Sequence, residues 1–280
     1  MSTPAAPRGA RANSSASNRL QLEQVALNLG GRAIIQPLSF ELRTGSFIAL
    51  LGPNGSGKTS LTKLGLGLLT PTAGAATLNG QPLTSFSSRR RAAHLAWLPQ
   101  RWEPSEPLPV EELIIAARYR FAEPYAVAKR RALSALERVG ARMLVGCRVN
   151  EISGGELQRV LLAALVAQEA PLIFCDEPAN HLDPAYQIAT YRLLGELWRA
   201  GAGVLCVTHD VNLLAHVGAD VRILGLKRGE LHLDSHYQHP QLSTQLSALF
   251  DVPFAVVNDG AVRQFYVQAS RADLSRGGAP

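Results

Sequence analysis

Residues 52 to 59, GPNGSGKT, restrict what this chain can fold into more than any other stretch does. They fit the phosphate-loop pattern at every fixed position, and the apolar run FIALL stands directly before them. Glycines let such a backbone approach phosphate oxygens, while Lys58 supplies a positive charge and Thr59 a hydroxyl that suits Mg²⁺. The stretch therefore predicts a strand, a loop and a helix that bind a nucleoside triphosphate. The expected nucleotide-binding residues of this loop are Gly52, Pro53, Asn54, Gly55, Ser56, Gly57, Lys58, Thr59 and Ser60.

Runs with strand composition alternate with helical apolar spacing in the second half of the chain. Such alternation is typical of an α/β fold with a mostly parallel sheet. Between residues 20 and 84, short β-like runs separated by turns predict further strands. The order expected after residue 170 is a strand at 171–178, a helix at 186–201, a strand at 203–210, a helix at 211–218 and a strand at 221–226.

Residues 103 to 168 have a different character from this α/β core. A proline-rich link, EPSEPLP, is followed by helical apolar spacing at 110–121 and again at 125–140. The segment therefore predicts a helical subdomain inserted into the core.

The two ends of the chain lie outside the predicted core of residues 19 to 235. Residues 1 to 18 are small, polar and unpatterned, which indicates a disordered tail, although arginine and serine without acidic residues would also suit a transit peptide. Residues 236 to 280 predict a small C-terminal α/β extension, with a helix around LSTQLSALF and a hairpin that turns at Asp259-Gly260.

Composition limits the role of membranes, nucleic acid and metals. The longest apolar run, at 160–167, is far shorter than the ~20 residues of a membrane span. The net charge is +6 and basic residues are dispersed apart from an arginine triplet at 89–91, which favours a solvated surface over binding to nucleic acid or anionic lipid. Cys147, Cys175 and Cys206 show no metal-binding spacing and are predicted to be reduced residues of a cytosolic protein.

Polar side chains follow three predicted strands at the point where each strand ends. Asp176 and Glu177 follow LIFC, and the carboxyl ends of parallel strands are where ligands bind in such folds. We expect Asp176 to be an outer-sphere partner of Mg²⁺ and Glu177 to orient or deprotonate the attacking water, although both could be surface carboxylates. His209 could contact a γ-phosphate or could make only a structural hydrogen bond. Gln100 carries an amide that suits Mg²⁺ or water.

A second potential anion site stands in EISGGELQR, at residues 151 to 159. A serine and two glycines at a helix start can bind an anion, because free amide groups and the positive end of the helix dipole point outward. The alternative is a serine cap that only satisfies the amides of its own helix. The apolar positions expected to bury this helix in the helical subdomain, apart from the phosphate-loop core, are Leu157, Val160, Leu161, Ala164 and Leu165.

In this order and spacing, GPNGSGKT, PQ, ISGGELQR, LIFCDEP, NHLD and THD resemble the motifs of the ATP-binding cassette (ABC) ATPase family over roughly residues 20 to 235. The resemblance implies a P-loop NTPase fold with an N-terminal antiparallel β part, and hydrolysis of ATP with Mg²⁺. It also implies that Thr59, Gln100 and Asp176 serve the metal. The residues that match family motifs are Gln100 in the Q-loop, Ser153, Gly154, Gly155 and Glu156 in the signature, Asp176 and Glu177 in the second nucleotide motif, Asp183 in the D-loop and His209 as the switch histidine.

Two further expectations come from this resemblance. In the family, the signature of one subunit closes over the γ-phosphate of ATP held by the other, so a homodimer that sandwiches two ATP molecules is expected. Ser153 should then matter to the partner's ATP and not to the ATP of its own chain. Leu29 stands where the family usually places an aromatic that stacks on adenine, and leucine cannot stack with that geometry.

Members of this family couple ATP hydrolysis to several different functions. DNA-repair members carry a long coiled coil between the nucleotide motifs, and translation factors carry two cassettes, whereas this chain has neither. A transporter subunit on the cytoplasmic face of the inner membrane is therefore expected, with permease subunits docking within residues 100 to 125 and a substrate-binding protein outside. HDVNLLA, EELIIAARYRF and DEPANHLD resemble importer ATPases for iron siderophores, haem and cobalamin, while zinc or manganese importers remain the alternative.

Overall fold

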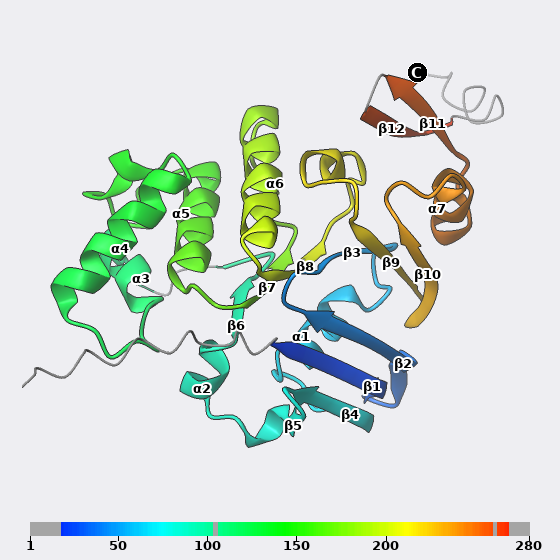
Figure 1. Ribbon diagram of the computed structural model, residues 1–280, viewed down its shortest axis with the longest axis horizontal. Helices are drawn as coiled ribbons and strands as arrows, with labels where there is room; N and C mark the ends of the chain where they lie inside the picture. Colours follow the sequence, from blue (N-terminus) through cyan, green and yellow to red (C-terminus); the bar gives the residue numbers. More distant parts are fainter. Residues whose placement is uncertain (1–17, 103–105, 260–261, 269–280) are drawn as a thin grey trace, which may run out of the picture.

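The computed structural model describes residues 18–102, 106–259 and 262–268. A six-stranded sheet lies at its centre, and the predicted mostly parallel order is confirmed (Figure 1). Four neighbouring pairs are parallel, and the edge pair is antiparallel. In order across the sheet the strands are β10 (Glu230–His236), β9 (Arg222–Lys227), β3 (Phe47–Leu51), β8 (Gly203–Val207), β7 (Leu172–Asp176) and β6 (Leu95–Leu98).

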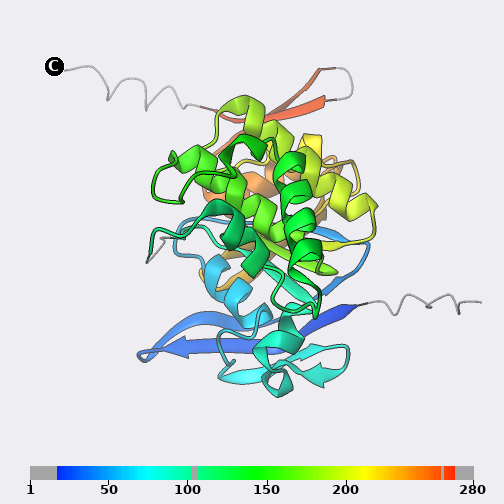
Figure 2. The ribbon, with the colours of Figure 1, turned by 90° about the vertical axis from the view of Figure 1, so that its left-hand side faces the viewer.

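A second sheet, built from the N-terminal part of the chain, is antiparallel, as expected. It lies below the central sheet in Figure 1 and below the helices in Figure 2. In order its strands are β2 (Arg32–Arg43), β1 (Arg19–Leu29), β4 (Ala73–Leu78) and β5 (Gln81–Pro82).

The helices gather mainly on the opposite side of the central sheet and at one end of the molecule (Figures 1 and 2). The α-helices are α1 (Lys58–Gly65), α2 (Ser88–Ala92), α3 (Val110–Ala116), α4 (Tyr125–Arg138), α5 (Gly154–Ala167), α6 (Pro184–Arg199) and α7 (Leu242–Phe250). The 3₁₀ turns are η1 (Leu83–Ser85), η2 (Arg142–Leu144) and η3 (Asn212–His216).

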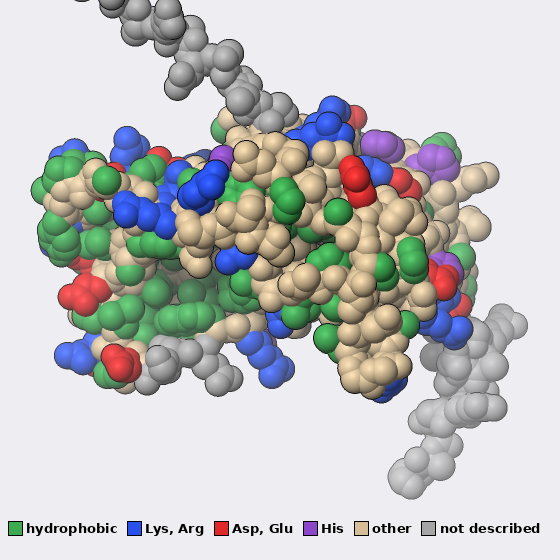
Figure 3. Space-filling view, turned by 90° about the horizontal axis from the view of Figure 1, so that it is seen from below, with side chains coloured by type: hydrophobic (Ala, Val, Ile, Leu, Met, Phe, Trp, Pro, Cys, Tyr) green, Lys and Arg blue, Asp and Glu red, His purple; other side chains and the backbone are tan. Residues whose placement is uncertain are grey.

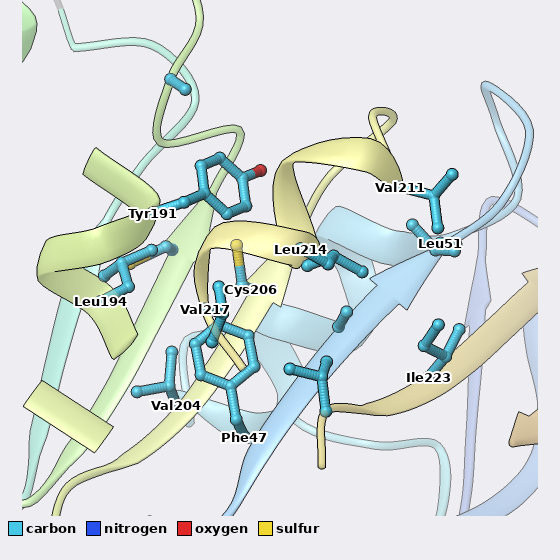
Figure 4. Close-up of a cluster of buried hydrophobic side chains, with 14 of the residues drawn as sticks. Phe47, Leu51, Tyr191, Leu194, Val204, Cys206, Val211, Leu214, Val217 and Ile223 are labelled. Atoms are coloured by element: carbon cyan, nitrogen blue, oxygen red, sulfur yellow. The ribbon is translucent and has the colours of Figure 1, made fainter. Parts of the chain in front are cut away.

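The central sheet is buried on both faces because its side chains alternate between two cores. Phe174 and Leu205 point to a core that lies between the two sheets and includes α1. Ile173 and Cys206 point to the other core, which α5, α6, η3 and α7 cover. Figure 4 shows part of this second core, where Tyr191 of α6 and Leu214 of η3 meet the strand residues. A third core lies within the helical segment and joins α3, α4 and α5.

The expectation that α5 is buried only within the helical segment is wrong. Val160 and Ala164 belong to the helical core, but Leu161 and Leu165 belong to the core on the central sheet. A helix that is apolar nearly all round can be buried on both faces, and the run VLLAALVA is such a sequence. The signature helix therefore joins the helical segment to the nucleotide-binding core.

Two other helices differ from their predicted form. The helix predicted at 110–121 ends at Ala116, and the amides of Arg118 and Tyr119 then donate to carbonyls only three residues back (both 3.0 Å), as in a series of turns. The helix predicted at 211–218 is only the 3₁₀ turn η3. There the side chain of Asp210 accepts from the amide of Asn212 (2.8 Å), a local bond that competes with α-helical pairing.

The C-terminal segment follows β10, which pairs with β9 as part of the central sheet. Helix α7 is followed by the expected antiparallel hairpin of β11 (Phe254–Asp259) and β12 (Val262–Val267). Leu246 of α7 and Phe265 of β12 both lie in the core on the central sheet, so this segment packs on the main body. The predicted turn residue Gly260 lies outside the described residues, and so do residues 1–17 of the tail predicted at 1–18.

Candidate active site

The phosphate loop joins the central strand β3 to the start of α1, as the sequence predicts. Its backbone needs glycine for steric reasons. Gly57 caps α1 with φ of 103°, and a Cβ there would lie 2.6 Å from Cδ1 of Ile35. Gly52 has φ of 149°, and a Cβ there would lie 2.0 Å from the carbonyl oxygen of Leu226. The loop is therefore packed tightly against β2 and β9, which fixes where its amide groups point.

Lys58 folds back over the loop from the first residue of α1. Its Nζ donates to the carbonyls of Gly52 (2.7 Å) and Pro53 (3.0 Å). Burial lowers the pKa of Lys58, and the negative charges of Glu177 and Asp176 partly offset that effect. The ammonium group thus lies between the loop and two carboxylates, where a phosphate would also be attracted to it.

Asp176 ends β7 and meets the start of α1. Thr59 Oγ1 donates to Asp176 Oδ2 over 3.1 Å, which joins two residues 117 positions apart. Burial raises the pKa of Asp176, and the charge of Glu177 adds to this, while the hydrogen bond from Thr59 acts in the opposite direction. A cation or a second donor at this position would favour the charged carboxylate.

Glu177 and His209 form a pair at the ends of β7 and β8. His209 Nε2 lies 2.8 Å from Oε1 of Glu177, and the Glu177 side chain is buried while the imidazole is largely exposed. Glu177 has φ of 54°, a left-handed conformation that is uncommon for a residue other than glycine. Its amide donates to the carbonyl of Val207 (3.0 Å), so neighbouring strands hold this backbone in place. Backbone of this kind is often found at functional sites.

These residues surround one cavity of about 350 Å³. It brings together most of the loop and every residue that the sequence placed at a strand end. The described residues that line it are Ile34, Asn54, Gly55, Ser56, Gly57, Lys58, Thr59, Ser60, Gln100, Asp176, Glu177 and His209. Gly52 and Pro53 support the loop from outside this lining, whereas Ile34 was not predicted. Ile34 lies in β2, and it reaches the cavity because the fold places this strand beside the loop. Nothing in the sequence around Ile34 predicts this.

The donor set at the cavity suits Mg²⁺. The Thr59 hydroxyl, the Asp176 carboxylate and the Gln100 amide offer oxygen atoms, which Mg²⁺ prefers. No cluster of three or more His, Cys, Asp or Glu side chains with metal-binding geometry occurs in the described part of the chain. The three oxygen donors at the cavity therefore fit a cation that is held by one or two protein oxygens together with the phosphates of a substrate.

The second predicted anion site, at the start of α5, lies outside this cavity. Ser153 caps the helix in a complete capping box with Glu156. Glu156 Oε2 accepts from the amide (2.9 Å) and from the hydroxyl (2.8 Å) of Ser153. These bonds lower the pKa of Glu156. Ser153 and Gly154 are exposed, so the cap is open to an approaching molecule although its own carboxylate now takes two of its donors.

The start of α5 also contacts the loop that carries Glu177 in the same chain. The buried amide of Gln158 donates to the carbonyl of Pro178 over 2.9 Å. A Cβ on Gly155 would lie 3.3 Å from the carbonyl oxygen of His181. Helix α5 is therefore in direct contact with the loop that follows Glu177 in its own chain, which the sequence did not predict.

Two other predicted residues lie outside the cavity. Asp183 caps α6, and its Oδ1 accepts from the amide of Tyr186 (3.1 Å). Leu29 is at the end of β1, with 47% of its surface exposed. The aliphatic side chain that faces the cavity from this sheet is Ile34.

In the view from below, Lys and Arg side chains are spread among other types (Figure 3). Over residues 18–102, 106–259 and 262–268, no helix is long and apolar enough to cross a membrane.

Comparison with known proteins adds a family and several relatives. The family model described as ABC transporter matches residues 35–180. The hemin import ATP-binding protein HmuV of Pseudomonas putida is 34% identical over 246 residues, which cover 85% of this chain and 94% of that protein. The zinc import ATP-binding protein ZnuC of Pseudomonas fluorescens is 36% identical over 196 residues, which cover 70% of this chain and 69% of that protein.

Solved structures share the fold. A chain of an inward-facing transporter provisionally assigned to the metal-chelate type superposes with a TM-score of 0.75 at 24% identity, covering 90% of this chain and 98% of that chain. The ATP-binding cassette MJ0796, in a dimeric post-hydrolysis state bound to ADP and Pi, superposes with a TM-score of 0.71 at 24% identity, covering 79% of this chain and 99% of that chain.

Proposed function

This chain belongs to the ABC transporter family and is an ATP-binding, ATP-hydrolysing importer subunit, and from that premise we propose that it drives uptake of an iron-siderophore, haem or cobalamin type substrate through separate permease subunits. The observation that carries the proposal is the single cavity where Lys58, Glu177 and His209 converge. The relation to the hemin importer subunit over 85% of this chain supports the substrate class.

The cavity gives each residue a role in hydrolysis. The amide groups of the loop and Lys58 bind the β- and γ-phosphates. Glu177, 2.8 Å from His209, orients or deprotonates the attacking water, and His209 contacts the γ-phosphate. Thr59, Asp176 and Gln100 would hold Mg²⁺, which supplies charge neutralisation at the phosphates when bound.

The working unit is a homodimer that sandwiches two ATP molecules. The start of α5 does not line the cavity of its own chain, and yet it presents an exposed serine and glycine at a helix N-terminus. Such a cap fits the γ-phosphate held by a second copy. Asp183, exposed at the start of α6, belongs to the same facing surface. ATP binding closes the dimer and opens the permease, and hydrolysis resets both.

The permease docks beside the Q-loop, within residues 100 to 125, at the cytoplasmic face of the membrane. Tyr119 of this segment, half-exposed, lines a cavity of about 330 Å³ whose other lining residues, among them Leu66, Leu68 and Trp97, lie outside the segment. Its mainly apolar lining suits the cytoplasmic helices of a membrane protein. A substrate-binding protein acts with the permease on the outer side.

Zinc or manganese is the second candidate substrate class, because the zinc import subunit ZnuC is as similar in identity as the hemin subunit. The hemin match extends over 246 residues and the zinc match over 196. The longer match favours the haem and siderophore class.

Uptake in a strain that lacks this chain tests the proposal. Radiolabelled haem, ferric siderophore, cobalamin and zinc are supplied separately, and the wild-type chain or Glu177→Gln is returned on a plasmid. We expect the wild type, and not the variant, to restore uptake of one of the first three. Restored zinc uptake alone would select the second candidate. An inactive ATPase in the purified transporter would contradict both.

A further inference from the structure

A buried tyrosine hydroxyl lies behind the proposed hydrolytic pair. Tyr191 projects from α6 into the core on the central sheet, and only 1% of its surface is exposed. Figure 4 shows its ring among Leu194, Cys206 and Leu214. A hydroxyl in such apolar surroundings is unfavourable unless it has a partner. Its partner is Thr208, whose Oγ1 accepts from the Tyr191 hydroxyl over 2.6 Å.

The Tyr191 hydroxyl acts as a donor. Burial raises the pKa of Tyr191 well above its usual value, so the phenol keeps its proton. The short bond then fixes the side-chain rotamer of Thr208, which is itself buried.

Thr208 in turn holds the backbone on both sides of His209. Its Oγ1 also accepts from the amide of Asp210 (3.2 Å), and its own amide donates to the carbonyl of Leu50 in β3 (3.2 Å). The imidazole of His209 is 44% exposed, so packing around the ring does little to fix it. The backbone held by Thr208 therefore sets how His209 meets Glu177, 2.8 Å away.

We propose that Tyr191 is a positioning residue for ATP hydrolysis, which holds His209 in register with Glu177 through the hydroxyl of Thr208. The proposal rests on the proposed function, since it assigns His209 a role in hydrolysis. It also connects two parts of the site, because α6 begins at Asp183, on the surface proposed to face the second copy. A shift of α6 on dimer closure is transmitted through Tyr191 to His209.

Steady-state ATPase kinetics of Tyr191→Phe test this role. The variant keeps the ring and removes the hydroxyl. We expect kcat to fall about tenfold with KM for ATP unchanged, because a misplaced catalytic group slows the reaction and not the binding of nucleotide. Thr208→Val, which also removes the acceptor of the Asp210 amide, should lower kcat at least as much, and Thr208→Ser, which keeps a hydroxyl, should retain most of the rate. The double variant should lose little more than Thr208→Val alone, since that variant already removes the bond to Tyr191.

Tyr237→Phe is the matched control. Tyr237 is 2% exposed in the same core, but its hydroxyl donates to the carbonyl of Arg263 (3.1 Å) in the hairpin. We expect this variant to lower the melting temperature about as much as Tyr191→Phe does, while kcat stays at the wild-type value.

The His209→Ala background separates positioning from general stability. There, Tyr191→Phe should cause no further loss of kcat, because its effect passes through the imidazole. Equal kcat in Tyr191→Phe and Tyr237→Phe would overturn the proposal, and so would a full additional loss in the His209→Ala background. If Tyr191→Phe does not fold, the comparison of Thr208→Ser with Thr208→Val decides. A wild-type chain without ATPase activity would instead refute the proposed function.

Discussion

The phosphate loop and the start of α5 are both glycine-containing helix N-termini, but they are built differently. The loop at 52–59 is held between β2, β9 and α1, and Lys58, Asp176 and Glu177 complete a cavity around it within one chain. The start of α5 is exposed, and its donors are taken by the carboxylate of Glu156. The loop therefore lies at a cavity that its own chain completes, whereas the start of α5 lies outside that cavity and is open to solvent.

This difference fits the proposed homodimer, in which each chain would contribute to two ATP sites. An anion-binding helix start that faced its own nucleotide would be expected to line the same cavity, and Ser153 does not. At the same time α5 contacts its own catalytic loop through Gln158. We therefore propose that the helix serves the partner's ATP through Ser153 and its own Glu177 through Gln158.

The largest effect is expected from a substitution in the cavity around the phosphate loop. Glu177→Gln keeps the size of the side chain and removes the carboxylate that we propose activates the attacking water. ATP should still bind, while turnover should fall by about 100-fold or more, the scale of a lost general base. Equilibrium nucleotide binding and steady-state ATPase assays measure the two quantities. Turnover at the wild-type rate would remove Glu177 from the catalytic role.

The second-largest effect is expected from a substitution at the start of α5. Ser153→Arg removes the cap and places a bulky cation at the positive end of the helix, so it should block closure and abolish most ATPase activity. Mixed with Lys58→Ala subunits, it forms dimers in which one site is damaged twice and the other is intact. Activity should reappear on mixing, although neither variant is active alone. Continued inactivity in purified mixed dimers would contradict independent sites shared between two chains.

The sequence was sufficient for the parts of the site that depend on local structure. The loop around Lys58 needs a strand before it and a helix after it, and Asp176, Glu177 and His209 each follow a recognisable strand. Because parallel strands end at one edge, their meeting at one cavity could be predicted from order alone.

Contacts that depend on tertiary packing could not be predicted in this way. Ile34 reaches the cavity only because β2 packs beside the loop, and nothing near it in sequence marks it. The double burial of α5 needs a sheet on one side and helices on the other, which its apolar run permits but does not specify. The same holds for Gln158, whose partner Pro178 is 20 residues away.

A moderate effect is expected from the contact within one chain. Gln158→Leu removes the amide that holds Pro178 and leaves a buried carbonyl without its donor, which costs about 1–3 kcal/mol of stability. Displacement of the neighbouring Glu177 should also lower kcat several-fold.

Mixed dimers show whose site Gln158 serves. In a dimer of Gln158→Leu with Lys58→Ala, the competent phosphate loop belongs to the Gln158→Leu subunit, and the rate should be low. In a dimer of wild type with a subunit that carries both substitutions, it belongs to the wild-type subunit, and the rate should be near that of a single intact site. The reverse order of rates would show that Gln158 acts on the partner's site.

The smallest effect is expected at Glu156, the residue that makes the two anion structures unequal. Glu156→Gln keeps a capping side chain but removes a negative charge that competes with phosphate for the Ser153 donors, so KM for ATP should fall about two- to threefold at low salt. The melting temperature should fall slightly, because a carboxylate stabilises a helix N-terminus. Since the Ser153 bonds lower the pKa of Glu156, that stabilisation is present at neutral pH and disappears as the pH falls through the lowered pKa. Thermal unfolding of both proteins from neutral to acidic pH measures this, and a melting difference that persisted in acid would show that the charge is not its cause.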